Sequence, residues 1–457
     1  MINWRKPTIY TLLKATNSEI PQALRFFLSV EYEPYEKLKE IQEKKLRKLL
    51  RHANRYVPYY RSVFKKANLI KSSGKINLNN FKNIPPLTKK QIRKKFEHLK
   101  STDPGYDKRN PHLNTSGGST GEPVRFIQDD YYDQWNFANK IYYKKTFGGH
   151  EIGQKELRLW GSAKDLYYGK VPLKERLKKK LYNRIDLNCY RMGRKDIQGF
   201  VDRINKEKPN WIEAYAMAAF EIAKFINQTN QKIYSPSGIV TSTTTLHPEM
   251  KELIEKVFCC SVYNRYGSRE VGDAACSCAT GKGLHTNLIN HYVEILNNNL
   301  EPVGTNEIGT LHITTLNNFS MPLIRYNIGD LAESPKDVNR FCSCGRGFPL
   351  IKRIIGRETD IFETTEGNRF YGGSFTRLFY LKDWCQRFQV IQKDYDYIQI
   401  NILPNREFLN KFERDRRELF EMAQKLMGKD CRIEINLVDN IKPSSGGKHL
   451  YTINKIK

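Results

Sequence analysis

The sequence lacks any uninterrupted apolar run that could cross a membrane. Its most apolar window, residues 214–226, is broken by Glu221 and Lys224, whereas a spanning helix needs about 20 consecutive apolar residues. The first fourteen residues contain basic and polar side chains instead of the apolar core of a secretory signal. We therefore expect a cytoplasmic protein.

Acidic residues are scarce relative to basic ones. Lys and Arg number 77 against 49 Asp and Glu, which gives a formal net charge of +28 over 457 residues. Such a surplus indicates an anionic partner, or simply a lysine-rich soluble surface. No recognised nucleic-acid-binding motif is present, so we expect no specific nucleic acid and keep a basic, zinc-containing nucleic-acid-binding protein only as an alternative. Peripheral association with an anionic membrane, through the basic helices expected before residue 100, is compatible with an enzyme.

Cysteines are few, and several are clustered. The nine include Cys276 and Cys278, followed by Cys342 and Cys344. An odd number in clusters is not the pattern of a disulfide framework, and in a cytoplasmic protein it indicates a metal site. The alternative is free cysteines in turns.

Strand-like and helical segments alternate through the middle of the chain. Residues 238–242 and 260–264 are typical of strands, and residues 248–257 between them are typical of a helix. This βαβ pattern predicts an α/β domain. Residues 388–438 form a shorter strand–helix–strand pattern, which predicts a compact α+β unit. We thus expect an α/β protein with a large, multi-subdomain N-terminal domain and a small α+β C-terminal domain, divided as 1–355 and 356–457.

The most informative segment is Thr-Ser-Gly-Gly-Ser-Thr-Gly-Glu-Pro at residues 115–123. Hydroxyl groups and exposed N–H groups on a glycine-rich backbone donate hydrogen bonds to phosphate oxygens. The segment is not a Walker A loop, because no Gly-Lys-Ser/Thr follows at the required spacing. By composition alone it is equally a flexible turn.

Four later segments also carry chemistry. Tyr266–Glu270 follows a strand, at the edge of a sheet where ligands bind, and Glu270 offers a carboxylate to Mg²⁺. Asp330, at the end of an Arg-Tyr-Asn-Ile-Gly-Asp run, offers acceptors to ribose hydroxyls or caps a turn. Gly356–Asp360 lies at the expected domain boundary, and Ser444–Lys448 presents a lysine on a glycine loop.

In their order and spacing, the five segments resemble the motifs of the adenylate-forming (AMP-binding) superfamily, specifically its phenylacetate–CoA ligase and CapK-like branch. The resemblance covers most of the chain. It implies ATP-dependent activation of a small-molecule carboxylate to an acyl-adenylate, release of pyrophosphate, and transfer of the acyl group to CoA. Transfer to an amine or hydroxyl, in surface-polysaccharide or natural-product biosynthesis, is the alternative.

The resemblance also implies roles for individual residues. Those that would bind the nucleotide and its phosphates are Ser116, Gly117, Gly118, Ser119, Thr120, Gly121, Tyr266, Gly267, Ser268 and Asp330. Glu270 would bind Mg²⁺, Arg357 would contact the nucleotide near the hinge, and Lys448, on a mobile C-terminal domain, would stabilise the charge of adenylation. Thr359 departs from the acidic residue usual at the hinge, which places the second half-reaction in more doubt than the first.

The cysteine clusters fit the same branch, which carries similar elements. Cys278 precedes His285 by seven residues, and Cys342 and Cys344 follow. Three thiolates and one imidazole complete a tetrahedral structural Zn²⁺ site within residues 276–344. Cys276 competes with Cys278 for one position.

Overall fold

The computed structural model describes residues 3–71, 73–116, 123–161, 172–189, 192–336, 342–379, 382–441 and 450–456. The chain forms two compact units. The first contains Met1–Ser116, Val124–Ile328 and Ala332–Ile354, and the second contains Gly117–Pro123, Gly329–Leu331 and Ile355–Lys457. Among the described residues, no helix has both the length and the apolar character that a membrane span requires.

Helices occupy the start of the first unit. They are α1 (Arg5–Ala15), α2 (Ile20–Val30), α3 (Tyr35–Tyr56), α4 (Pro58–Lys66), α5 (Lys89–Lys94) and α6 (Phe96–Leu99), with 3₁₀ turns at Leu78–Asn83 and Asp107–Arg109. Helix α3 ends before Pro58, which begins α4. The α5 start confirms the expected capping box, because Thr88 Oγ1 accepts from the Gln91 N–H at 3.3 Å and Gln91 Oε1 accepts from the Thr88 N–H at 2.7 Å.

An eight-stranded sheet forms the centre of this unit, in the order β13-β9-β8-β7-β6-β5-β3-β4. Its strands are β3 (Glu156–Trp160), β4 (Arg184–Asn188), β5 (Trp211–Tyr215), β6 (Gly238–Ser242), β7 (Val262–Ser268), β8 (Gly272–Ser277), β9 (Leu284–Thr286) and β13 (Leu350–Ile351). Neighbours from β4 to β7 run parallel, and those from β7 to β13 run antiparallel.

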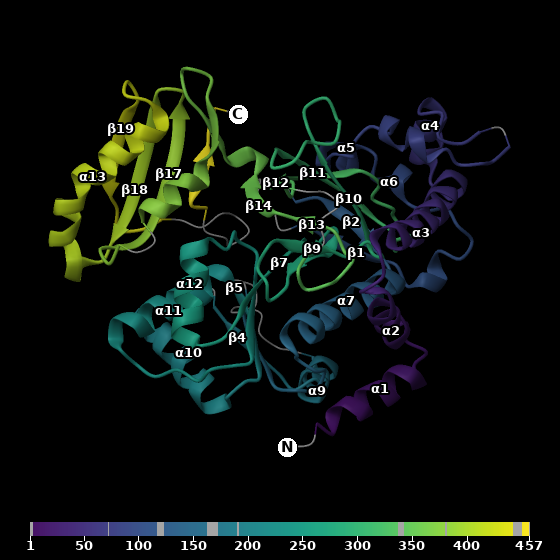
Figure 1. Cartoon of the computed structure of the whole chain (residues 1–457), viewed down its shortest axis with the longest axis horizontal. Coiled ribbons are helices and arrows are strands. Elements are labelled where there is room, and N and C mark those ends of the chain that lie inside the picture. Colours follow the sequence, from purple (N-terminus) through teal and green to yellow (C-terminus); the bar gives the residue numbers. More distant parts are fainter. Residues whose placement is uncertain are drawn as a thin grey trace. The chain divides into compact units, whose positions relative to one another are not determined.

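Helices cover both faces of this sheet. They are α7 (Asp130–Gly148), α9 (Leu173–Leu181), α10 (Arg194–Glu207), α11 (Ala216–Thr229) and α12 (Pro248–Phe258). In Figure 1, α10, α11 and α12 lie on one side of the parallel strands and α7 lies on the other. This βαβ arrangement confirms the predicted fold class.

Strand β7 is longer than the sequence predicts. The sequence predicts a strand that ends near Asn264 and a loop after it, but β7 continues to Ser268 and pairs antiparallel with β8. A register shift between Tyr266 and Gly267 breaks the period-two pattern that would have marked the extension. A side chain at position 267 would collide with the carbonyl oxygen of Gly272, so glycine is required there.

A second sheet has the order β10-β11-β12-β14. Its strands are β10 (His291–Leu296), β11 (Ile308–Thr315), β12 (Tyr326–Glu333) and β14 (Arg353–Arg357), and a separate hairpin consists of β1 (His112–Thr115) and β2 (Arg125–Gln128). A core cluster joins the apolar sides of α3 and α4 to this sheet through residues such as Leu49, Tyr60, Leu311 and Ile313.

The second unit is a small α+β structure. Its four-stranded sheet has the order β19-β18-β17-β20. The elements are β15 (Ile361–Glu363), β16 (Arg369–Tyr371), β17 (Cys385–Asp394), β18 (Tyr397–Pro404), α13 (Leu409–Met427), β19 (Arg432–Leu437) and β20 (Thr452–Asn454), with 3₁₀ turns at Glu358–Asp360, Gly372–Leu378 and Arg406–Phe408. Helix α13 buries Phe412, Leu419, Ala423 and Met427, and its charged residues face outward.

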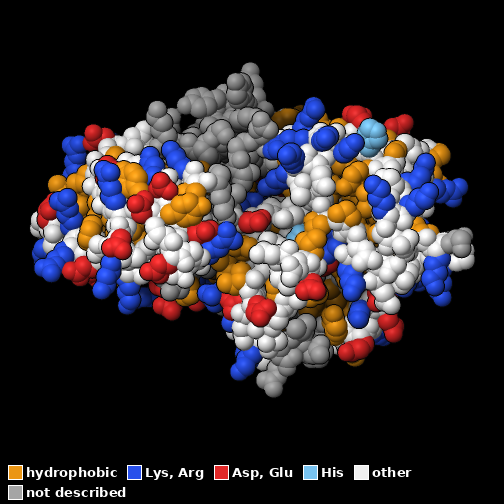
Figure 2. All heavy atoms as spheres, turned by 90° about the horizontal axis from the view of Figure 1, so that it is seen from above, with side chains coloured by type: hydrophobic (Ala, Val, Ile, Leu, Met, Phe, Trp, Pro, Cys, Tyr) orange, Lys and Arg blue, Asp and Glu red, His pale blue; other side chains and the backbone are white. Residues whose placement is uncertain are grey.

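The basic residues are widely distributed on the surface. Figure 2 shows Lys and Arg side chains across the visible face, with Asp and Glu side chains between them.

Candidate functional site

Glu270 lies in the turn between β7 and β8 and is only 4% exposed. The Tyr326 hydroxyl donates to Glu270 Oε1 at 3.3 Å. The Ser268 hydroxyl accepts from the N–H groups of Glu270 at 3.2 Å and Val271 at 3.4 Å, and so shapes the turn. A positioned carboxylate of this kind is a typical ligand for a hard cation.

Ser116 closes the base of the glycine-rich loop between β1 and β2. Its N–H donates to the Val124 carbonyl at 2.8 Å, and its Oγ accepts from the Val124 N–H at 2.8 Å. The other loop residues named from the sequence lie outside the described residues; they are Gly117, Gly118, Ser119, Thr120 and Gly121. The structure therefore defines where the loop leaves and rejoins the hairpin.

Three hydrogen bonds, made by the side chains of Gln128 and Arg269, tie this hairpin to the turn that carries Glu270. Gln128, at the end of β2, donates through Nε2 to the Arg269 carbonyl at 2.8 Å. Arg269 Nη1 in turn donates to the Thr115 carbonyl at 3.4 Å. The buried carboxylate and the base of the glycine-rich loop are thereby held together, although 154 residues separate Thr115 from Arg269. Sequence reasoning misses the part played by Gln128, because its partners are backbone carbonyls of a distant turn.

Tyr266, Gly267 and Ser268 are all part of β7. Tyr266 is half-buried and packs against the core cluster that contains the second sheet. It pairs with Ala275 of β8, while Gly267 pairs with Asp273. These residues thus lie in a strand immediately before the Glu270 turn, and Tyr266 retains a partly exposed ring.

Asp330 and Arg357 form an ion pair in the second unit. Arg357 Nε lies 3.0 Å from Asp330 Oδ1, and Asp330 is 6% exposed. Gly329 before it has a φ of +81°, which favours glycine. Lys448 belongs to residues 442–449, which lie outside the described residues.

Arg325 begins the motif that ends at Asp330, but its side chain has a structural role. Its side chain is fully buried, its Nε donates to Glu294 Oε2 at 3.0 Å, and its Nη1 donates to the Ile84 carbonyl at 2.6 Å. Burial raises the pKa of Glu294, and the Arg325 guanidinium opposes this. The guanidinium therefore joins β10 and β12 to the segment before α5.

Cys278, His285, Cys342 and Cys344 converge in one cluster. Their ligand atoms all lie within 4.8 Å of one another. The sulfurs of Cys278 and Cys342 are 3.5 Å apart, and Cys344 Sγ lies 3.4 Å from His285 Nε2. A disulfide requires about 2.05 Å, whereas four ligands at Zn–S of about 2.3 Å and Zn–N of about 2.0 Å would be separated by roughly 3.5–3.8 Å. The spacing therefore fits a tetrahedral metal site and not a disulfide.

The thiols and the imidazole of this cluster favour each other's charged forms. Burial lowers the pKa of His285, but hydrogen bonds to Cys278 and Cys344 outweigh this and raise it to about 10. Although burial raises it, hydrogen bonds from His285 and Thr280 lower the pKa of Cys278 to about 5. His285 Nδ1 lies 3.1 Å from the Phe348 carbonyl, so Nδ1 carries the donated proton and Nε2 faces the cysteines. Cys276 lies outside the group, which leaves Cys278 as the ligand of the two.

Comparisons with known proteins agree with this architecture. Residues 362–455 match the family model of the CapK C-terminal domain. Protein CapK of Staphylococcus aureus is 24% identical over 439 residues, which cover 92% of this chain and 89% of that protein. A 2-hydroxyisobutyryl-CoA ligase, solved in the postadenylation state with R3-HIB-AMP, superposes with a TM-score of 0.72 at 19% identity and covers 93% of this chain and 91% of its own.

A second solved structure shares this fold at lower similarity. O-succinylbenzoate coenzyme A synthetase of Bacillus subtilis, solved with AMP, superposes with a TM-score of 0.52 at 13% identity, over 74% of this chain and 67% of its own. At these identities the solved structures establish a shared fold.

Proposed function

Because the chain has the adenylate-forming ligase fold and carries a CapK C-terminal domain at residues 362–455, we propose that it activates a carboxylic acid with ATP. The carboxylate attacks the α-phosphate, an acyl-adenylate forms, and pyrophosphate leaves. The observation that supports this most directly is the link between the Glu270 turn and the base of the glycine-rich loop, through Gln128 and Arg269. A carboxylate held beside a phosphate-binding loop is the arrangement that a nucleotide with its cation requires.

In this proposal the residues named from the sequence act as follows. Ser116 and the loop residues after it bind the ATP phosphates, while Tyr266 stacks near adenine. Asp330 accepts hydrogen bonds from the ribose hydroxyls, and Arg357 contacts the nucleotide beside it. The observed Asp330–Arg357 pair, at 3.0 Å, supports the last two roles because it holds both side chains in defined positions.

Glu270 fits the cation that accompanies ATP. Its carboxylate is buried, and the Tyr326 hydroxyl orients one of its oxygens. Mg²⁺ bound there would neutralise charge on the phosphates during attack. Lys448, on the C-terminal glycine loop, would stabilise the negative charge that develops on the α-phosphate.

The proposal is tested by ATP–pyrophosphate exchange with a panel of aryl, alkyl and amino acids. Wild-type protein should catalyse exchange with at least one class of acid. Glu270→Gln and Lys448→Ala should each abolish exchange, and Lys448→Ala should leave ATP binding largely intact. Glu301→Gln removes an exposed carboxylate of the same unit and serves as the matched control. Full exchange by Lys448→Ala, or inactivity of the wild type across the panel, would refute the proposal.

We propose CoA as the acyl acceptor, with an amine or hydroxyl of a biosynthetic intermediate as the competing acceptor. The solved relatives that bind acyl-adenylates are CoA ligases, whereas the match at residues 362–455 is to the CapK C-terminal domain. Isolated acyl-adenylate complex should release a thioester when CoA is added. Adenylate that persists with CoA but is consumed by an amino sugar or alcohol would identify the other acceptor class.

We also propose that the cysteine–histidine cluster holds a structural Zn²⁺ ion. Four protein ligands would complete its coordination and leave no position for substrate. Protein purified without chelators should contain about one zinc per chain, and Cys344→Ser should lose the metal and lower the thermal midpoint. Cys431→Ser, at a buried cysteine outside the cluster, is the matched control. Substoichiometric zinc in the wild type would contradict the site.

A further inference from the structure

A layer of charged side chains lies between α7 and the central sheet. Four cations, Lys140, Lys144, Arg158 and Arg265, face three carboxylates, those of Glu156, Glu213 and Asp273. Lys144 Nζ lies 2.6 Å from Glu156 and 2.9 Å from Glu213, and Arg265 lies 2.8 Å from Glu213. Charges removed from water in a protein are normally paired. Among these seven groups the cations exceed the carboxylates by one, and Lys140 itself is half-buried.

Lys140 is the cation left over. Among the described residues, no ion pair or hydrogen bond joins its ammonium to a partner, whereas its neighbour one turn later, Lys144, contacts two carboxylates. Asp273 favours its protonated form, but burial and the guanidinium groups of Arg265 and Arg158 outweigh this and lower the pKa of Lys140. The Nε atoms of Arg158 and Arg265 are buried without a hydrogen-bond partner, and so is Asp273 Oδ2, which lies 3.5 Å from Arg265 Nε.

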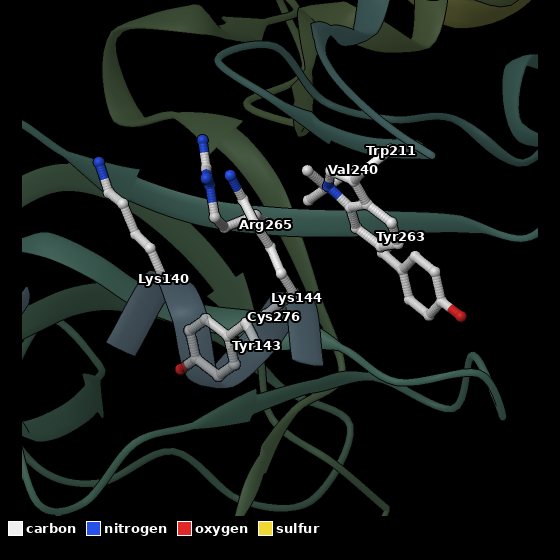
Figure 3. Close-up of a pocket in the computed structure, with 8 residues that line it drawn as sticks. All are labelled: Lys140, Tyr143, Lys144, Trp211, Val240, Tyr263, Arg265 and Cys276. Carbon is white, nitrogen blue, oxygen red and sulfur yellow. The ribbon is translucent and has the colours of Figure 1, made fainter. Parts of the chain in front are cut away.

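Three of these cations line a small cavity. It has a volume of about 10 Å³ and is lined by Lys140, Lys144 and Arg265 together with Trp211, whose ring nitrogen also has no partner. Figure 3 shows the nitrogen-bearing ends of the three cations pointing the same way between α7 and the sheet. The cavity has room for about one water-sized group, so it accepts an oxygen atom and excludes an aromatic ring.

The layer lies next to the region where the carboxylate would react. At one end of α7, Gly148 lies against Trp211, at the start of β5. Towards the other end, Asn136 Oδ1 accepts from the Asp273 N–H at 3.0 Å, close to the Glu270 turn. Lys140 lies on α7 between these two points.

On the face of the sheet that packs against α7, the side chains nearer the carboxyl ends of β3 and β5 are aromatic. Arg158 and Glu213 are paired in register and face α7. Trp160 and Tyr215 come two residues later on the same strands, so they share that face, and their ring centroids are 4.3 Å apart. An acid that lies along these rings with its reacting carboxylate towards Glu270 therefore directs its far end at the cations.

We propose that Lys140, assisted by Arg158 and Arg265, binds a second carboxylate at the far end of the substrate, so that the acid activated here is a small dicarboxylate. This inference rests on the proposed adenylation for its identification of the site. An apolar acyl tail does not fit, because it would bury the unpaired ammonium without any compensating interaction. A second carboxylate supplies the missing anion and accepts charge-assisted hydrogen bonds from the unsatisfied donors.

The test compares acids of equal carbon number in ATP–pyrophosphate exchange: malonate with propionate, succinate with butyrate and glutarate with valerate. In the wild type the best dicarboxylate should exceed its partner at least 10-fold in kcat/KM. Lys140→Met should lower that value about 10- to 100-fold for the dicarboxylate, the effect of one charged hydrogen bond, and leave the monocarboxylate unchanged or improved. Lys145→Met, on the surface of the same helix, should preserve the wild-type selectivity.

Other outcomes separate this inference from the proposed function. Exchange that favours the monocarboxylates, or an equal loss for both acids in Lys140→Met, overturns the dicarboxylate assignment while adenylation stands. If no acid supports exchange, thermal denaturation still decides: succinate or glutarate should raise the wild-type midpoint and leave Lys140→Met unaffected, and no selective shift overturns the inference. Lys140→Met without ligand should melt no lower than wild type, because the lysine has no ion pair to lose. A lower midpoint would indicate a merely structural role.

Discussion

Replacement of Arg325 by Met should strongly destabilise the first unit. The guanidinium is fully buried and binds Glu294 Oε2 at 3.0 Å and the Ile84 carbonyl at 2.6 Å. Removal of one partner from a buried ion pair leaves an uncompensated charge and costs about 3–5 kcal/mol. The φ of +49° at this position is equally strained for Arg and Met, so it cancels in the comparison.

A double-mutant cycle isolates the interaction energy between Arg325 and Glu294 from their contacts with the rest of the protein. Arg325→Met combined with Glu294→Gln removes the stranded carboxylate, so the loss in the double variant should be smaller than the sum of the single losses by about 1–3 kcal/mol. Urea unfolding of the full chain, with hydrogen exchange of β10 and β12 as the local readout, measures these values. Arg203→Met removes a surface i,i+4 pair with Glu207 and should change stability by less than about 0.5 kcal/mol.

The pH dependence gives an independent check. Burial raises the pKa of Glu294 in the folded protein, so the folded state retains this proton to higher pH than the unfolded state. Stability from this group therefore falls as pH rises from the ordinary carboxyl pKa through the folded value. Without Arg325, the pH range over which this stability is lost should extend towards neutral pH. Glu294→Gln should abolish this pH dependence. A loss below about 1 kcal/mol in Arg325→Met, or strictly additive losses in the cycle, would refute the reasoning.

Contacts elsewhere in the first unit support three more predictions. Tyr326→Phe removes the hydrogen bond to Glu270 and should lower pyrophosphate exchange about 10- to 100-fold with little change in melting temperature; an unchanged rate would contradict a role in orienting the carboxylate. Gly267→Ala should lower the thermal midpoint sharply, because its Cβ would collide with the Gly272 carbonyl, and a midpoint equal to wild type would contradict the tight β7–β8 hairpin. Burial lowers the pKa of His291 to about 4, so the unfolded state binds the proton first on acidification; stability should fall by about 3 kcal/mol between pH 6.5 and 4. Thermal melts across that range should show a shallower decline for His291→Gln.

Much of this fold is predictable from the sequence because the signals are local. Helix α3 carries apolar residues at helical spacing, and Thr88 with Gln91 forms the α5 capping box within four residues. The order of the five motifs predicts the larger architecture, which the structural comparisons confirm. The β7 extension is missed because the register shift at Gly267 breaks the alternation that identifies strands.

The cysteine–histidine cluster and the charged layer differ in how far the sequence reveals them. Cys342 and Cys344 are two residues apart, and few residue types can ligate zinc, so their spacing alone indicates a candidate set of ligands. Lys140, Arg158 and Glu213 belong to three separate elements of a chain with 77 basic residues. Each one alone is an ordinary charged residue, and only the register of β3 with β5 and the packing of α7 reveal that they share an interior face.

Solvent exposure decides which charges can affect substrate specificity. The surface charges that make up most of the +28 are screened by salt, with a Debye length of about 8 Å at physiological ionic strength, and exposed pairs contribute little. The charges beneath α7 are buried or half-buried, so salt screens them less and a missing counter-charge has a larger energetic effect. In the proposed site, the Lys140 ammonium, which has no ion pair among the described residues, should therefore affect substrate selection more strongly than the whole surface excess. The dependence of exchange on salt distinguishes the two: selectivity between succinate and butyrate should persist at high ionic strength, and its loss on addition of salt would place the discriminating charge at the surface.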